Sequence, residues 1–378
     1  MKQYLTLLIS IILFSCDDAS KDAFIDEKIR TLNYLERIME EEGIPGVQVA
    51  IVKDNEVVLS ENLGVANVPF SVAVNDNTIF PICSISKIFA STAIMQLEEQ
   101  NKLILSDSIS KHIHNLPSHW NPVTIEQLLS HTSGLPDIED TVKDELIGGK
   151  GQDSAWLEVQ KMPLQFSPGE EFSYNATNYL LIQKIIEKYG QSSYEEFIEV
   201  NQFKVAGMQQ MVFANSSDVK ENKCPTYVYY YWDESIGDYV KGTNLIETSE
   251  EFPSILRADT GAFSSANEMA KWLIALQTGK LLKRERIDKM WTPIQLNSGE
   301  YGGFGGGLDR YALGWPVMTR EQHPALVPIG GGRAALAIYP EDDLAIILLT
   351  NLTGVLVHEI VDEISKFYYP KMLSPIPF

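Results

Sequence analysis

One stretch constrains this chain more than any other: Phe80-Pro81-Ile82-Cys83-Ser84-Ile85-Ser86-Lys87, followed by an apolar run to Leu97. The pattern indicates an extended segment that becomes a buried helix at about Ser84. Because helix positions i and i+3 share a face, the Ser84 hydroxyl and the Lys87 amine would lie within reach of each other. Such a pair can act as a serine nucleophile and its lysine base. The same spacing recurs at Ser108/Lys111 and Ser217/Lys220, so spacing alone does not identify the site.

Length and charge exclude several classes of protein. The chain has 378 residues, 44% of them hydrophobic, which suffices for a sizeable core in one large unit of two lobes. Its formal net charge is −21, and no cluster of Lys and Arg is visible. Nucleic-acid binding needs such a cluster, so we expect no nucleic-acid partner. The six histidines lack metal-ligand spacing and the glycine-rich 301–307 lacks a Gly-Lys-Ser/Thr ending, so we expect no metal and no cofactor.

The N-terminus has the layout of a secretory signal. Met1-Lys2 precedes a short apolar run, Tyr4 to Phe14, and polarity changes abruptly after Cys16. This layout resembles a bacterial lipoprotein signal, which implies a signal peptide at 1–15, acylation of Cys16 and a polar tether at 16–22. The expected location is the bacterial cell envelope, with the lipid as anchor on the periplasmic side or the cell surface. The alternative is an ordinary signal peptide with an incidental cysteine.

Three cysteines are too few for a disulfide scaffold. In an oxidising compartment Cys83 and Cys224 could pair. The other interpretation, which we favour for Cys83, is a buried thiol beside the nucleophile.

Helix and hairpin patterns occur at both ends of the chain. Amphipathic spacing indicates the helices, and apolar segments on either side of polar turns indicate the hairpins. The segments are a helix at 23–42, a hairpin from 47–52 and 57–60, a hairpin from 334–339 and 344–350, and a helix at 358–367. They bracket a mainly helical middle with Ser84 at the junction, which favours an α+β architecture over a run of βαβ units.

The middle of the chain contains three further features. Thr124 is a predicted N-cap for the helix that follows it. His131 lies in a turn-rich segment, where it is either a base or, as we expect, a hydrogen-bonded structural histidine. The aromatic stretch from Tyr227 to Val240 predicts a hairpin insert whose rings either line a cleft or lie on the surface.

Several stretches together resemble the serine β-lactamase-related family, which contains class C β-lactamases, DD-peptidases and esterases. They occur in the family's order and cover residues from about 25 to 370. They are 80–97, 125–136, 168–179, 261–278, 311–315 and 334–351. The resemblance implies an α+β fold: a mixed antiparallel sheet with flanking helices, a helical lobe, and the nucleophile at their junction. The implied domain is 23–375, with an α/β lobe at 23–82 and 255–375 and a helical lobe at 83–254.

The family's motifs are partly present. Its Ser-x-x-Lys motif maps onto Ser84 and Lys87, which implies nucleophile and base. Its Tyr-x-Asn motif maps onto Tyr174, which implies a proton relay to the leaving group. The third position of that motif is Ala176. The asparagine is therefore missing, and Asn175 is offset by one residue.

The family's third motif, Lys-Thr-Gly or His-x-Gly, has no counterpart in this chain. The best local match places Ile329 where the basic residue belongs. Gly330 and Gly331 are candidates for substrate or oxyanion contact, and Arg333 is a candidate for the missing positive charge. His323 is a weaker candidate for the same role.

These observations predict a cell-envelope serine hydrolase that forms an acyl-Ser84 intermediate on an ester or a small amide or peptide. The alternative, motivated by Ala176 and Ile329, is a catalytically impaired family member that acts as a binding or scaffold protein. A true β-lactamase is the third hypothesis, weakened because the cation that would hold a substrate carboxylate is missing.

Overall fold

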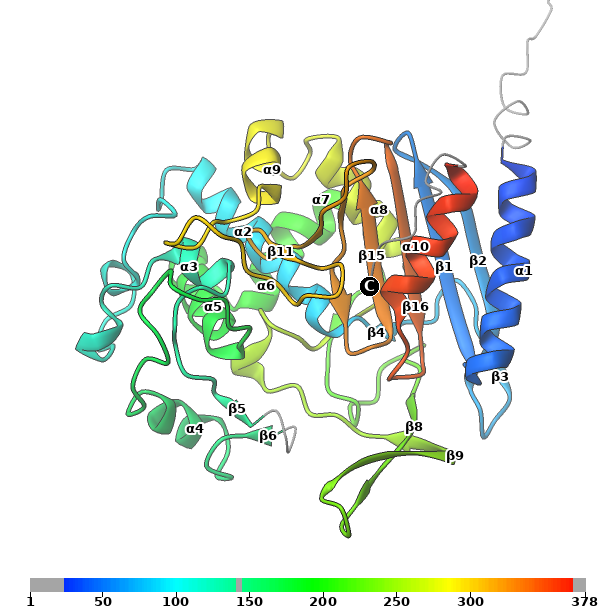
Figure 1. Ribbon diagram of the computed structural model, residues 1–378, viewed down its shortest axis with the longest axis horizontal. Helices are drawn as coiled ribbons and strands as arrows, with labels where there is room; N and C mark the ends of the chain where they lie inside the picture. The colour runs from blue at the N-terminus through cyan, green and yellow to red at the C-terminus, as the bar shows by residue number, and fades with distance from the viewer. Residues whose placement is uncertain (1–23, 141–144, 370–378) are drawn as a thin grey trace, which may run out of the picture.

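The computed structural model describes residues 24–140 and 145–369 (Figure 1). The predicted signal peptide, the lipidation site Cys16 and the tether lie outside these residues. Within the described residues, no helix combines the length and the apolarity needed to cross a bilayer.

The fold is built on a nine-stranded antiparallel sheet, which confirms the predicted β-lactamase/DD-peptidase-like α+β class. Both predicted terminal hairpins are present and pair with each other at its centre, in the order β15-β16-β1-β2. The strands of the sheet are β1 (Gly46–Lys53), β2 (Glu56–Asn67), β3 (Val72–Ala73), β11 (Arg310–Tyr311), β12 (Pro316–Met318), β13 (Ala325–Leu326), β14 (Ile329–Gly330), β15 (Ala334–Tyr339) and β16 (Leu344–Thr350).

The central strands are buried on both faces, and alternate residues enter two different cores. In β1, Val47, Val49 and Ile51 pack on one face, in a core shared with α1 (Ile25–Glu42) and α10 (Val357–Tyr368). Ala50 and Val52 face the other core, which includes α2 (Lys87–Glu99) and α8 (Ala266–Gln277). The sheet therefore lies between a two-helix layer and the larger helical body (Figure 1).

The helical body surrounds α2, in which Lys87 through Glu98 are all buried. Its other helices are α3 (Ile125–Leu129), α4 (Gln152–Val159), α5 (Ala176–Gly190), α6 (Tyr194–Ile198), α7 (Lys204–Ala206) and α9 (Arg284–Trp291). Thr124 caps α3 as predicted, in a reciprocal capping box with Gln127. The division of the chain into two lobes at the predicted boundaries stays a prediction.

Short strands complete the structure: β4 (Phe80–Pro81), β10 (Ala262–Ser264) and β7 (Val212–Phe213) form one small sheet, and β5 (Glu139–Asp140) pairs with β6 (Glu145–Leu146). The predicted aromatic hairpin is β8 (Thr226–Asp233) and β9 (Asp238–Thr248), a ribbon that extends away from the body (Figure 1). Tyr227 is buried. Trp232 and Tyr239 are exposed on the surface of the hairpin, where their rings make an edge-to-face contact.

Candidate active site

Ser84 lies in a 3-10 turn, Cys83–Ser86, between β4 and α2. The helical segment expected from about Ser84 thus begins as this 3-10 turn and becomes the α-helix α2 at Lys87. The turn starts at Cys83, whose φ of +46° is in the left-handed region. Such a conformation is costly for a residue with a side chain and persists only when its surroundings impose it. Here the Ile82 N–H donates to Ala262 O of β10 at 3.0 Å. The turn is thus clamped, and Ser84 is more exposed than its neighbours.

Strand β14 clamps the same turn from the other side. A Cβ on Gly330 would lie 2.0 Å from Ile82 O, so only glycine permits this approach. The close contact places the neighbouring Ile329 and Gly331 next to Ser84, and both line a cavity with it. Gly330 therefore acts as a packing residue that brings the third-motif strand to the nucleophile.

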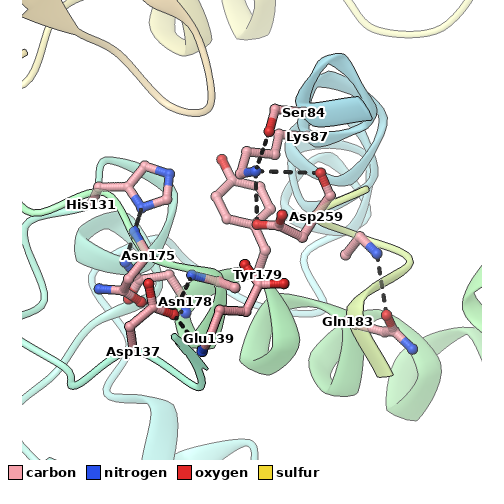
Figure 2. Close-up of polar contacts among 12 residues, drawn as sticks. Ser84, Lys87, His131, Asp137, Glu139, Asn175, Asn178, Tyr179, Gln183 and Asp259 are labelled. Carbon is pink, nitrogen blue, oxygen red and sulfur yellow. Dashed lines mark hydrogen bonds and ion pairs between the residues drawn. The ribbon is translucent and has the colours of Figure 1, made fainter. Parts of the chain in front are cut away.

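Lys87 begins α2 and directs its amine at Ser84. Its Nζ donates to Ser84 Oγ at 3.2 Å and to Asp259 O at 3.3 Å, and it lies 2.7 Å from Asp259 Oδ1. The ammonium also lies over the Tyr174 ring, 4.6 Å from the ring centroid. Figure 2 shows Lys87 between Ser84 and Asp259. The structure thus brings Ser84 and Lys87 together as the spacing predicted.

Asp259 is the residue that sequence reasoning missed. Its side chain and that of Lys87 are only 8% and 2% exposed, so the ion pair is buried. Its Oδ1 accepts no well-aligned hydrogen bond from the described residues, which makes the 2.7 Å contact ionic in character. The only signal in the chain was an acidic residue just before 261–278, one of the stretches that carry the resemblance.

Tyr174 lies against the Ser84–Lys87 pair. Burial, reinforced by the negative charge of Asp259, raises the pKa of Tyr174 well above its ordinary value of 10.0, and the interaction with Ser84 opposes this only in part. The phenol therefore keeps its proton at neutral pH. A protonated phenol beside the nucleophile can give a proton to a leaving group.

His131 supports the segment that carries Tyr174. Its Nδ1 accepts from the Asn175 N–H at 3.2 Å and lies 3.0 Å from the Asn178 side-chain amide nitrogen. Because Nδ1 is the acceptor, the neutral ring has its proton on Nε2. Burial, together with the charge of Lys87, lowers the pKa of His131 well below 6.5. This geometry agrees with a structural histidine rather than a base.

The missing asparagine is not replaced by its neighbour. Asn175 caps α5 by accepting from the Asn178 N–H at 3.1 Å, and its amide donates to Leu135 O. Ala176 is the first residue of α5, and its N–H donates to the Asp137 carboxylate at 3.0 Å. Burial raises the pKa of Asp137 to about 6. Asn175 and Ala176 thus make no hydrogen bond to Lys87 among the described residues, and the side chain that forms an ion pair with Lys87 is Asp259.

Two cavities meet at Ser84 and Gly331. The first, of about 180 Å³, has walls that are mainly apolar and aromatic; they are Tyr174, Phe304, Tyr311, Gly314, Pro316, Pro328 and Ile329. The second, of about 500 Å³, has five carboxylate side chains in its lining, namely Glu139, Glu145, Glu250, Glu251 and Asp259. The nucleophile thus has an apolar side and an acidic side.

The candidate cations of the third motif are engaged elsewhere. Arg333 lines the acidic cavity, but its guanidinium is buried and donates to both oxygens of Glu250, at 2.6 and 2.5 Å. His323 pairs with Asp342 at 2.6 Å and lines neither cavity. Ile329 stands in the apolar wall. Among the described residues, those lining the apolar cavity include no Lys, Arg or His.

Other sequence candidates are not part of the Ser84–Lys87–Tyr174 cluster. Lys111, the partner of Ser108 in the second Ser-x-x-Lys match, pairs with Asp107 instead. Cys83 and Cys224 are both buried and form no disulfide. Burial raises the pKa of the Cys224 thiol to about 12, so that thiol is not ionised at neutral pH. No group of His, Cys, Asp or Glu in the described part of the chain is arranged to hold a metal ion.

Comparisons with known proteins identify the family of this chain. The family model described as Beta-lactamase matches residues 32–366. The chain is 23% identical over 339 residues to Protein flp of Staphylococcus aureus (strain MW2), covering 88% of this chain and 64% of that one, so it spans less than two thirds of that curated relative.

Solved structures show the same fold. The octameric penicillin-binding protein homologue from Pyrococcus abyssi matches with a TM-score of 0.72 and 26% identity, covering 91% of this chain and 76% of that one. D-amino acid amidase from Ochrobactrum anthropi SV3 matches with a TM-score of 0.75 and 21% identity, covering 90% and 99%. Because the family model covers most of its length, this chain belongs to the β-lactamase family and is homologous to serine hydrolases of that family.

Proposed function

We propose that this protein is a serine hydrolase that forms an acyl intermediate on Ser84 and acts on an ester or a small amide. The observation that carries the proposal is the cluster of Ser84, Lys87 and Tyr174 where two cavities meet. A nucleophile within reach of its base, with the base held by a third group, is the general arrangement of covalent catalysis. The N-terminal signal supports a location in the cell envelope, with Cys16 as the acylated residue.

In the acylation step, Ser84 Oγ forms a bond to the substrate carbonyl carbon. Its proton passes to Lys87 Nζ, which acts as the base in its amine form. Tyr174 then donates its phenolic proton to the leaving group as the bond from the carbonyl carbon to that group breaks. The phenol is restored by a proton from Lys87, and water later hydrolyses the acyl-Ser84 ester.

The ion pairs Lys87–Asp259 and Arg333–Glu250 argue against β-lactams as the main substrate. A substrate carboxylate needs a positive partner, and an uncompensated charge is costly to bury. Lys87, which contacts Ser84, and Arg333, which lines the acidic cavity, are buried cations that already pair with Asp259 and Glu250. This favours esters and small amides that do not depend on a carboxylate anchor.

The test is labelling of the mature protein with a fluorophosphonate probe, detected by intact mass and peptide mapping. We expect one label, on Ser84, and none in Ser84→Ala. Ser108→Ala is the matched control and should label as the wild type does. A folded wild-type protein that is not labelled at Ser84 would refute the proposal.

One observation favours a second function. Lys87 Nζ donates to Ser84 Oγ, where a base would accept, and it also lies 2.7 Å from Asp259 Oδ1. If the pair never releases a proton, the protein binds its ligand without turnover. Ser84→Ala would then leave ligand binding and cellular function unchanged, and a loss of turnover in that variant excludes this alternative.

A further inference from the structure

The position of Tyr174 indicates which part of the substrate the apolar cavity beside Ser84 would hold. Tyr174 lines this cavity. The acidic cavity is lined by residues that include Asp259 and Arg333, and Tyr174 is not among them. A group that protonates the departing atom must lie within hydrogen-bond distance of it. If Tyr174 is the proton donor, the leaving group therefore lies on the apolar side, and the acyl group lies toward the acidic side.

The walls of this side suit an uncharged ring or chain. Tyr174, Phe304 and Tyr311 surround the cavity as an aromatic cluster, with ring centroids 5.1 Å apart for Tyr174–Phe304 and 5.9 Å for Phe304–Tyr311. Pro316, Pro328 and Ile329 complete the wall. The volume of about 180 Å³ compares with the roughly 150 Å³ of an apolar cavity that binds benzene.

Ile329 lines the apolar cavity at the position where the family's third motif has its basic residue. It lies on β14, which the contact between Gly330 and Ile82 holds against the Ser84 turn. Its side chain is partly exposed, so it contributes to the surface that a leaving group meets. A carboxylate entering here would lose water without gaining a cation, because the described residues that line the cavity include none.

We propose that this cavity is the leaving-group subsite, that it takes uncharged hydrophobic leaving groups, and that Ile329 determines this specificity. The substrate class is thus an ester of a neutral hydrophobic alcohol or phenol, or the corresponding amide. The inference rests on the proposed acyl-Ser84 chemistry and adds which side of the substrate enters which cavity.

The test uses two aryl alkylphosphonates that differ only in the leaving group, para-(carbamoylmethyl)phenoxide or para-(carboxymethyl)phenoxide. Ser84 Oγ attacks phosphorus, the aryl oxide departs, and the label stays on the serine, so no deacylation is needed. We expect the neutral compound to label wild-type Ser84 about tenfold faster or more, after correction for their rates with hydroxide.

Two substitutions make the test specific to Ile329. Ile329→Lys should shift the ratio of the two labelling rates toward the carboxylate by about tenfold or more, because it supplies the missing cation. Ile329→Met, which is uncharged and of similar size, should keep the wild-type preference. Equal rates in the wild type, a preference for the carboxylate, or the same ratio in the Lys and Met variants would each overturn the inference.

The failure of this inference differs from the failure of the proposed function. Labelling of Ser84 by both compounds without preference overturns only the leaving-group assignment. A folded wild-type protein in which neither these compounds nor the fluorophosphonate labels Ser84 overturns the acyl-serine chemistry, and the subsite assignment with it.

Discussion

The carboxylate of Asp259 lies 2.7 Å from the Nζ of Lys87, and both side chains are almost completely buried. The carbonyl oxygen of Asp259 accepts from the same nitrogen at 3.3 Å. One residue therefore engages the lysine twice and leaves its third N–H directed at Ser84 Oγ (Figure 2). Asp259 contacts Lys87 in a site where the family's asparagine is replaced by Ala176.

Asp259→Ala should lower the free energy of unfolding by about 3–5 kcal/mol, because it leaves the Lys87 ammonium buried without a partner. Asp259→Asn should cost less, since its amide oxygen can still accept from Nζ. Urea unfolding monitored by circular dichroism measures both. Adding Lys87→Met to Asp259→Ala should recover much of the loss. An Asp259→Ala variant as stable as the wild type would show that the pair is not coupled.

The loss of the Asp259 carboxylate should also change the rate of Ser84 labelling. Asp259→Asn removes the carboxylate that lies 2.7 Å from Lys87 Nζ, so the fluorophosphonate should label Ser84 about tenfold more slowly or slower still. Glu251→Gln, which removes a carboxylate from the same cavity but not from Lys87, is the matched control. An unchanged labelling rate in Asp259→Asn would contradict a role for the pair in activating Ser84.

Tyr174→Phe should reduce turnover of unactivated esters by about 10²- to 10⁴-fold, because it removes the proton donor for the leaving group. The loss should be smaller with nitrophenyl esters, whose leaving group departs without a proton. Since burial raises the pKa of Tyr174 well above 10.0, the donor stays protonated as pH rises, and activity should show no alkaline loss from this group below pH 10. Tyr311→Phe, in the same wall, is the control, and an equal effect on both kinds of ester would contradict the assignment.

His131 should make the protein sensitive to acid. Its pKa is lowered well below 6.5 by burial. Between the two pKa values, this side chain is therefore protonated in the unfolded chain and neutral in the folded chain. The stability contributed by the neutral ring is complete above pH 6.5 and is lost as pH falls toward the folded-state pKa. The loss is at most about 1.4 kcal/mol per pH unit for one group.

The measurement is the melting temperature between pH 8 and pH 5. His131→Leu should be less stable at pH 8, because the Asn175 N–H and the Asn178 amide lose their acceptor. It should also show a shallower pH slope than the wild type. His358→Gln is the comparison variant, because burial also lowers the pKa of His358. An unchanged slope in His131→Leu would assign the acid sensitivity to other groups.

Arg333→Met should destabilise the fold by about 3 kcal/mol, since it leaves Glu250 without its bidentate partner. Arg333→Met/Glu250→Leu should recover part of that loss in thermal unfolding. If the guanidinium is committed to Glu250, removing it should not change the preference between charged and neutral leaving groups. A selective loss of labelling by the carboxylate compound in Arg333→Met would instead identify Arg333 as a substrate anchor.

Local sequence determined much of the fold. The two terminal hairpins and the flanking helices α1 and α10 follow from apolar patterns within each segment, because period and turn residues act over a few positions. The Ser84–Lys87 contact is also local, since three residues separate the two side chains. Local pattern did not reveal that the helix begins as a 3-10 turn at Cys83–Ser86, because the contacts of Ile82 with Ala262 and Gly330, which hold this turn, come from distant segments.

Only the tertiary structure determined which charged side chains of the site pair with each other. Asp259 is 172 residues from Lys87, and Glu250 is 83 residues from Arg333. No periodicity connects such positions, because their contact depends on how strands and helices pack. The sequence by itself therefore predicted the pair of Ser84 and Lys87. It also showed that the family's asparagine and third-motif cation are absent. Folding determined that a buried carboxylate holds the lysine, and that an apolar wall with Ile329 stands where the cation would be.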